Sequence, residues 1–132
     1  MNNIRQGDLS LHIAKLNKEV LEIEFYEGKE SISLSSLKKV KVEGNRFVLA
    51  WGEATGHNHA LLDYEENKFE VYQDEKGRHI LKINEPITLA HVIGDSVKTA
   101  DHNPQTVEVG WYVQEQEEEF DPFINTVRKV VD

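Results

Sequence analysis

The sequence predicts an all-β, mainly antiparallel fold, a small barrel or sandwich that closes with a short C-terminal α-helix. Apolar residues alternate with polar ones over most of the chain, which is the period of half-buried strands. Clusters of Gly, Asn, Asp and Glu separate these runs, as expected of turns. The length of 132 residues is that of one ordinary domain, so we expect residues 1–132 to form a single β-rich domain.

The predicted strands follow one another with short turns between them. In chain order they cover residues 9–13, 21–26, 32–34, 40–42, 47–51, 57–62, 69–73, 79–83, 87–91 and 107–113. The run at 47–51 is apolar on both faces, as expected of a central strand. Residues 94–104 are polar and irregular, which indicates a long loop. We expect the aromatic side chains to fill the core, among them Trp51, Phe69, Trp111 and Tyr112.

The end of the chain changes from strand to helix character. Asp121 followed by Pro122 is typical of a helix start, because Asp caps free amides and Pro fits the first turn. Apolar residues then follow at helical spacing, namely Phe123, Ile124, Val127, Val130 and Val131. We therefore predict a short amphipathic helix over about residues 122–131.

Charge and composition exclude several function classes. The chain has 15 Lys and Arg against 24 Asp and Glu, a net charge of -9, which disfavours binding to nucleic acid. It has no cysteine, and therefore no disulfide and no thiolate site. The N-terminus lacks an apolar signal segment, and no run is long enough to span a membrane. We expect a cytoplasmic protein. A protein partner and a homo-oligomer are both open alternatives.

The candidate chemistry centres on a His-x-His pair that follows a Gly-rich turn. His57 and His59 point to the same face of a strand, with Cα atoms about 6–7 Å apart. Two imidazoles placed in this way can converge on one metal ion. Gly56 permits a left-handed backbone directly before the pair. Glu53 lies in the same turn, where it would act as a ligand or as a general base.

Two later histidines extend this candidate site. His91 ends an apolar strand face and is expected to point inward, and His102 lies beside Asp101, which could orient a ligating ring. The first hypothesis is a metal-dependent protein, either a small hydrolase or a cupin-like enzyme. Its metal ligands would be His57, His59, His91 and His102, with Glu53 catalytic and zinc as the nominal divalent transition metal.

The second hypothesis is a non-enzymatic bacterial or phage accessory or binding module, in which the histidines are structural. A lone His-x-His pair is common, and an inward-facing histidine is more often part of a core than a ligand. The two remaining histidines, His12 and His79, are interpreted as incidental. No nucleophile elbow and no phosphate-binding Gly motif occurs.

The stretch Gly52-Glu53-Ala54-Thr55-Gly56-His57-Asn58-His59 resembles a signature of small bacterial and phage proteins, Gly-Glu-(Ala/Val)-Thr-Gly-His-x-His. Gln6-Gly7-Asp8 near the start and His102-Asn103-Pro104 near the end are similar to further features of that family. The resemblance covers most of the chain and implies no known activity.

A looser resemblance is to cupins, small β-barrels with a His-x-His metal motif and a following acid. Asp63 or Glu65 would stand for that acid. The spacing from Gly52 to His57 is one residue short of the cupin pattern, and the second cupin motif is absent. The analogy therefore extends only to fold and ligand type.

Overall fold

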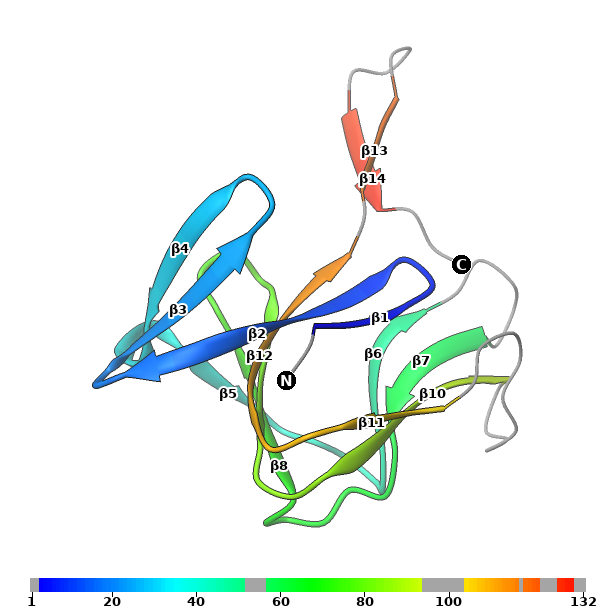
Figure 1. Cartoon of the computed structure of the whole chain (residues 1–132). Helices are drawn as coiled ribbons and strands as arrows, with labels where there is room; N and C mark the ends of the chain where they lie inside the picture. The colour runs from blue at the N-terminus through cyan, green and yellow to red at the C-terminus, as the bar shows by residue number, and fades with distance from the viewer. Residues whose placement is uncertain (1–2, 52–56, 94–103, 117, 122–125, 130–132) are drawn as a thin grey trace.

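The computed structural model describes residues 3–51, 57–93, 104–116, 118–121 and 126–129. These residues form fourteen strands, one short 3-10 turn at Leu34–Ser36, and three antiparallel sheets (Figure 1). The all-β prediction is therefore confirmed.

The larger sheet has eight strands and curls strongly (Figure 1). Seven of them lie side by side in the order β4 (Gly28–Ser33), β3 (Val20–Phe25), β2 (Leu9–Asn17), β12 (Gly110–Gln116), β9 (His79–Ile83), β8 (Phe69–Gln73) and β5 (Lys38–Val40). The eighth, β1 (Ile4–Gln6), pairs with β2. Hairpins join β2 to β3, β3 to β4 and β8 to β9. Strands β2 and β12 are neighbours in the sheet, although almost a hundred residues separate them in the sequence. Their pairing places an early and a late segment of the chain side by side.

The second sheet has four strands in the order β11 (Gln105–Val107), β10 (Ile87–Ile93), β7 (His57–Leu61) and β6 (Phe47–Trp51). The β6–β7 register shifts between Val48 and Ala50, which leaves Leu49 out of the regular ladder as a bulge. A separate two-stranded ribbon, β13 (Glu118–Asp121) with β14 (Thr126–Lys129), follows the larger sheet and projects from it (Figure 1).

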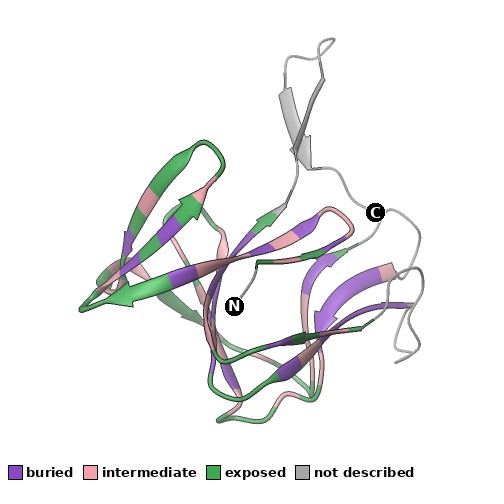
Figure 2. Cartoon of the chain, viewed as in Figure 1, coloured by how far each residue is buried: buried purple, intermediate pink, exposed green. Residues whose placement is uncertain are grey.

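Both faces of the larger sheet carry a core. Along β2, residues 9 and 11 face one way and residues 12 and 14 the other, as the period of a strand requires. The first face packs against the four-stranded sheet through a cluster that includes Leu11, Leu61, Phe69, Leu89 and Tyr112. The opposite face, enclosed by the curl, carries a smaller cluster: Ala14, Leu21, Ile23, Ile32, Ile80 and Val113. Figure 2 shows the buried residues concentrated on the central strands and the exposed ones on the β3–β4 hairpin.

Several local predictions are wrong: the strand predicted at 107–113 is split into β11 and β12, and the predicted central strand at 47–51 is the edge strand β6. The segment predicted as a helix over 122–131 contains strand β14, whose Val127 pairs with Phe120; its other residues lie outside the described part of the chain. Thr126 and Val127 are β-branched, and β13 supplies the backbone partners that a strand needs. Trp51 is 60% exposed instead of buried, because it ends an edge strand. The third strand runs over Gly28–Ser33 and not over residues 32–34, because it pairs with β3 directly after the turn.

The predicted loop at residues 94–104 falls almost wholly outside the described residues, which resume at Pro104. Among the described residues, no helix has the length and apolar character needed to cross a membrane.

Candidate functional site

Strands β7 and β10 bring three of the predicted site histidines together. His57 and His59 share one face of β7, and His91 lies directly opposite His59 in the antiparallel register. The His59 and His91 rings stack, with centroids 4.4 Å apart and an interplanar angle of 10°. The His57 ring meets His91 edge-on at 5.6 Å. His59 and His91 are buried, which confirms the expectation that His91 points inward.

Gln6 of β1 orients the His59 ring. Its amide nitrogen donates to the Leu89 carbonyl at 3.3 Å, and its Oε1 lies 2.7 Å from Nδ1 of His59. Because the amide nitrogen faces a carbonyl, the amide oxygen must be the acceptor, so Nδ1 of His59 carries the proton. In the neutral ring this places the lone pair on Nε2. The sequence indicated Gln6 only as part of a family signature. Its role could not be predicted, because its partner His59 lies 53 positions away in the sequence.

The geometry of the three rings sets limits on metal binding. Two imidazoles on one tetrahedral zinc ion have centroids about 5 Å apart, given zinc–nitrogen bonds of about 2.0–2.1 Å. The separation of His57 and His91 fits that value. The stacked rings of His59 and His91 do not, because lone pairs in two parallel planes cannot meet at one ion. Within the described residues, no group of three His, Cys, Asp or Glu side chains could hold a metal.

The other two predicted site residues, Glu53 and His102, lie outside the described residues. Their segments leave from one end of the four-stranded sheet. Residues 52–56 connect Trp51 to His57, and residues 94–103 follow Ile93, which pairs with His57. Ligation by His102 and catalysis by Glu53 therefore stay predictions.

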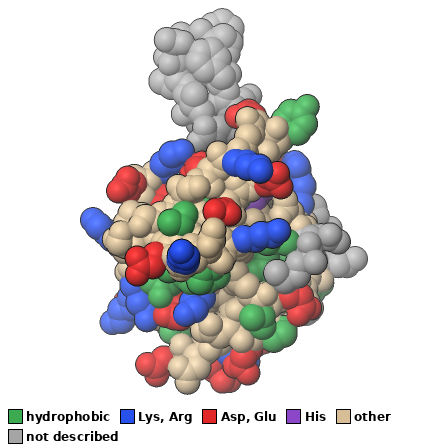
Figure 3. All heavy atoms as spheres, turned by 60° about the vertical axis from the view of Figure 1, so that its left-hand side comes forward, with side chains coloured by type: hydrophobic (Ala, Val, Ile, Leu, Met, Phe, Trp, Pro, Cys, Tyr) green, Lys and Arg blue, Asp and Glu red, His purple; other side chains and the backbone are tan. Residues whose placement is uncertain are grey.

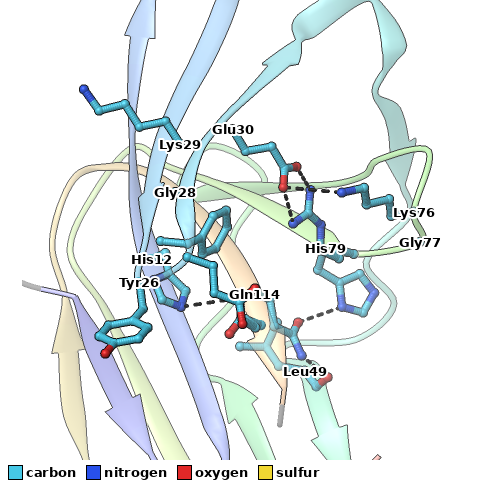
Figure 4. A pocket seen from close by; sticks show the side chains of 14 residues that line it. His12, Tyr26, Gly28, Lys29, Glu30, Leu49, Lys76, Gly77, His79 and Gln114 are labelled. Carbon is cyan, nitrogen blue, oxygen red and sulfur yellow. Dashed lines mark hydrogen bonds and ion pairs between the residues drawn. The ribbon is translucent and has the colours of Figure 1, made fainter. Parts of the chain in front are cut away.

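Sequence reasoning missed a groove whose lining includes none of the three clustered histidines. It has a volume of about 720 Å³ and is lined by the middle of β2, the β3–β4 turn, Leu49 of β6, the β8–β9 hairpin and the end of β12 (Figure 4). Its size is in the range of small-molecule sites. Two positions interpreted as incidental, His12 and His79, both line it.

Gln114 orients His79 in the same way that Gln6 orients His59. Its Nε2 donates to the Leu49 carbonyl at 2.8 Å, and its Oε1 lies 2.9 Å from Nδ1 of His79 (Figure 4). The bulge at Leu49 turns this carbonyl away from the ladder and toward Gln114. Nδ1 of His79 is therefore the donor, and Nε2 carries the lone pair in the neutral ring.

An ion network fixes the groove's upper wall. The Arg78 guanidinium donates hydrogen bonds to both carboxylate oxygens of Glu30, and Lys76 lies 3.4 Å from Glu30 (Figure 4). Arg78 also donates a hydrogen bond to Asp74. Hydrogen bonding from Arg78 is the main reason that the pKa of Glu30 lies below its usual value, with the charges of Arg78 and Lys76 adding to it. The network joins β4 to the β8–β9 hairpin.

His12 forms part of the groove's floor. Its ring packs edge-on against Phe25 at 4.8 Å, and its Nε2 lies 3.9 Å from Glu115. That distance is too long for a hydrogen bond, and the buried Nε2 has no hydrogen-bond partner within the described part of the chain.

A family described as a domain of unknown function, DUF8820, matches residues 5–116. The chain belongs to this family. The DUF8820 match begins within β1 and ends with β12, so it includes both Gln–His pairs, the three clustered histidines and the groove, and leaves out β13 and β14. No curated protein and no solved structure matches the chain.

Proposed function

We propose that this DUF8820 domain is a non-enzymatic binding module that holds a small polar ligand in the groove of Figure 4. The observation that carries the proposal is the groove itself, an open hollow of about 720 Å³ lined by charged, amide and aromatic side chains. Concave sites with a few convergent polar groups are the usual places for small ligands.

The walls of the groove are held in place before any ligand binds. The Glu30–Arg78–Asp74 network ties β4 to the β8–β9 hairpin, and the Leu49–Gln114–His79 chain ties the two sheets together. A preformed site loses little conformational freedom on binding, which favours affinity.

The arrangement of the clustered histidines supports binding over catalysis. His59 and His91 stack in the interior, and Gln6 holds His59 in one tautomer. A buried ring with a defined hydrogen-bond partner, such as that of His59, is typical of a structural histidine. Their position gives them no access to the groove lined by His12 and His79.

The proposal can be tested by screening a small polar fragment library against ¹⁵N-labelled protein by NMR. We expect hits to shift the amide signals of groove residues such as His12, Gly77 and Glu115. Glu115→Trp should abolish these shifts by filling the groove, and Glu66→Trp, at an exposed position away from the groove, should leave them unchanged. Hits that map elsewhere, or that survive Glu115→Trp, would reject the groove as the binding site.

Metal binding is a second candidate, favoured by the 5.6 Å separation of the His57 and His91 rings and by the lone pair on Nε2 of His59. Ligation by all three would need a rotation of the His59 or His91 ring out of the stack. His102 would complete the predicted ligand set, and Glu53 would then be the base of a hydrolase. Zinc remains the nominal metal.

Melting curves of untagged protein with EDTA and with added zinc test this candidate, together with elemental analysis. A bound ion stabilises the folded state, so a metal protein should melt lower in chelator. Replacing His57 and His59 by Gln should remove that response. Identical wild-type curves in the two conditions, with less than about 0.1 equivalent of any transition metal, would eliminate the metal site.

A further inference from the structure

The groove is lined by three acidic and three basic side chains, but these charges are not all paired with one another. Glu30 and Asp74 are matched by Arg78 and Lys76 in the ion network. Lys29 lies 4.0 Å from Glu24, a carboxylate outside the groove.

Two lining carboxylates remain, Glu27 and Glu115. Glu27 is exposed and has no charged or hydrogen-bonding partner within the described residues. Glu115 has only the 3.9 Å approach of His12 Nε2. Neither carboxylate has a Lys or Arg within ion-pair distance among the described residues, so both present negative charge to the groove.

An aromatic residue next to Glu27 in the sequence also lines the groove. Tyr26, at the β3–β4 turn, is fully exposed and lines the groove (Figure 4). Phe25 next to it already receives a cation on its ring, since the Arg78 guanidinium carbon lies 5.9 Å from the ring centroid. The Phe25 ring therefore already contacts the Arg78 cation of the protein itself. The exposed Tyr26 ring can accept the cation of a ligand.

We propose that the groove binds an organic ammonium ligand, whose charge is shared by Glu27 and Glu115 and whose apolar part rests on Tyr26. This inference rests on the proposed function, because it names the ligand class of the same groove. Aromatic faces with flanking carboxylates recognise ammonium groups through the ring quadrupole and direct ion pairing.

The net charge of the whole chain also favours a cationic ligand. A net charge of -9 attracts cations toward the surface and repels carboxylates and phosphates. Figure 3 shows acidic and basic side chains interspersed over the face on the β3–β4 side, with no broad basic patch that would select an anion. Of the three cations that line the groove, Lys76 and Arg78 are paired with Glu30 and Asp74, and Lys29 lies 4.0 Å from Glu24.

Three ligands of equal chain length separate the possible ligand classes. Butane-1,4-diamine carries two ammonium groups, butane-1,4-diol is neutral, and succinate carries two carboxylates. Each is titrated into the ¹⁵N-labelled full chain at neutral pH and about 0.15 M salt, where non-specific attraction to exposed charges is largely screened. We expect the diamine alone to give saturating shifts at His12, at residues 26–29 and at Glu115.

Matched variants test the roles of the two carboxylates and the ring. Glu115→Gln, Glu27→Gln and Tyr26→Leu should each weaken diamine binding about threefold to fivefold, the effect of losing one exposed ion pair or cation–π contact. Glu66→Gln removes the same charge from an exposed site outside the groove and should leave the affinity unchanged. All four positions are exposed, and the spectra themselves report whether each variant is folded.

The outcomes distinguish the two levels of the proposal. If the diol or succinate shifts the groove signals and the diamine does not, the ammonium class is wrong and the binding groove stands. If the diamine shifts no groove signal, or binds every variant as tightly as wild type, the ammonium proposal is overturned. In that case the fragment screen decides separately whether the groove binds anything.

Discussion

At the residue scale, Gln6 and Gln114 each connect one backbone carbonyl of the four-stranded sheet to one histidine ring. Gln6 joins Leu89 to His59, and Gln114 joins Leu49 to His79. Each amide uses its nitrogen on the carbonyl and its oxygen on the ring, so each fixes the tautomer of its histidine. One of these histidines lies in the core and the other lines the groove.

Replacing Gln6 by Met should lower the free energy of unfolding by about 1–3 kcal/mol, because His59 Nδ1–H and the Leu89 carbonyl each lose a buried partner. Urea denaturation measures this change. Gln105→Met is the matched control, since Oε1 of Gln105 has no hydrogen-bond partner within the described residues, and its loss should cost far less. Equal losses in the two variants, or NMR evidence for the Nε2–H tautomer of His59, would contradict this account.

Tyr72 gives the structure a defined sensitivity to alkaline pH. Its hydroxyl donates to Glu70 at 2.8 Å, and burial together with this bond raises the pKa of Tyr72 from 10.0 to about 12. A group whose folded pKa is raised contributes stability that is complete below its unfolded pKa. That contribution is lost as the pH rises through the folded value.

The stability advantage of wild type over Tyr72→Phe should therefore be constant up to about pH 9 and shrink between pH 10 and 12. Urea denaturation of both proteins across this range measures the difference, and titrations common to both cancel. A difference that does not change with pH would show that the hydroxyl ionises at the same pH in the folded and unfolded chains.

At the scale of elements, the Glu30–Arg78 pair holds the outermost strand of the larger sheet in place. Strand β4 is joined to the sheet by its ladder with β3, and its outer edge has no strand partner among the described residues. The bond between Glu30 and Arg78 links positions 48 apart and anchors β4 to the β8–β9 hairpin. The same link keeps the groove at a defined width.

Glu30→Gln should lower the unfolding free energy at pH 7 by about 0.5–1 kcal/mol, the value for a partly exposed ion pair. Because the pKa of Glu30 is lowered, its contribution is present above the unfolded value of about 4.5 and is lost as the pH falls through the folded value. The two proteins should therefore converge as the pH falls below 4.5 and through the lower folded pKa of Glu30.

Urea denaturation at pH 7 and pH 3 measures this convergence, and hydrogen exchange should show faster opening of β4 in the variant. Glu24→Gln is the control, because its ion pair with Lys29 is 4.0 Å long and fully on the surface. If Glu24→Gln costs as much as Glu30→Gln, the effect reflects overall charge and not the link between β4 and the hairpin.

At the scale of the whole molecule, the buried cluster residues that the structure describes all precede the last two strands. The cluster residues of the two cores lie between Leu9 and Val113, and the family match ends at residue 116. Among the described residues, β13 and β14 make their extensive contacts with each other. We therefore expect the two described clusters to form without the ribbon.

A chain shortened to residues 1–116 should fold and keep its near-UV circular dichroism, with a urea midpoint close to that of the full chain. The reason is that the apolar surface buried in the two clusters is unchanged. A full chain carrying Phe120→Ser tests the ribbon without shortening the protein and should also keep the midpoint. Loss of cooperative unfolding in both proteins would place residues 117–132 within the folding unit.

The sequence by itself determined the fold class, most of the strands and the face on which each side chain lies. A period of two residues specifies these features locally, because alternate side chains must point to opposite sides of a strand. For this reason His57 and His59 were correctly expected to be neighbours, and His91 to be buried. The C-terminal segment was misjudged because five apolar residues in so short a stretch fit a helix as well as a strand.

Only the tertiary structure decided which strands lie side by side, and through that the contents of both candidate sites. Alternation fixes a face but carries no information about the partner strand or the register. The contacts of Gln6 with His59, Gln114 with His79 and Glu30 with Arg78 span 53, 35 and 48 positions, and each depends on such a pairing. The groove has no local sequence signal, because its lining residues become neighbours only when β2, β12 and β9 pair and the larger sheet curls around them.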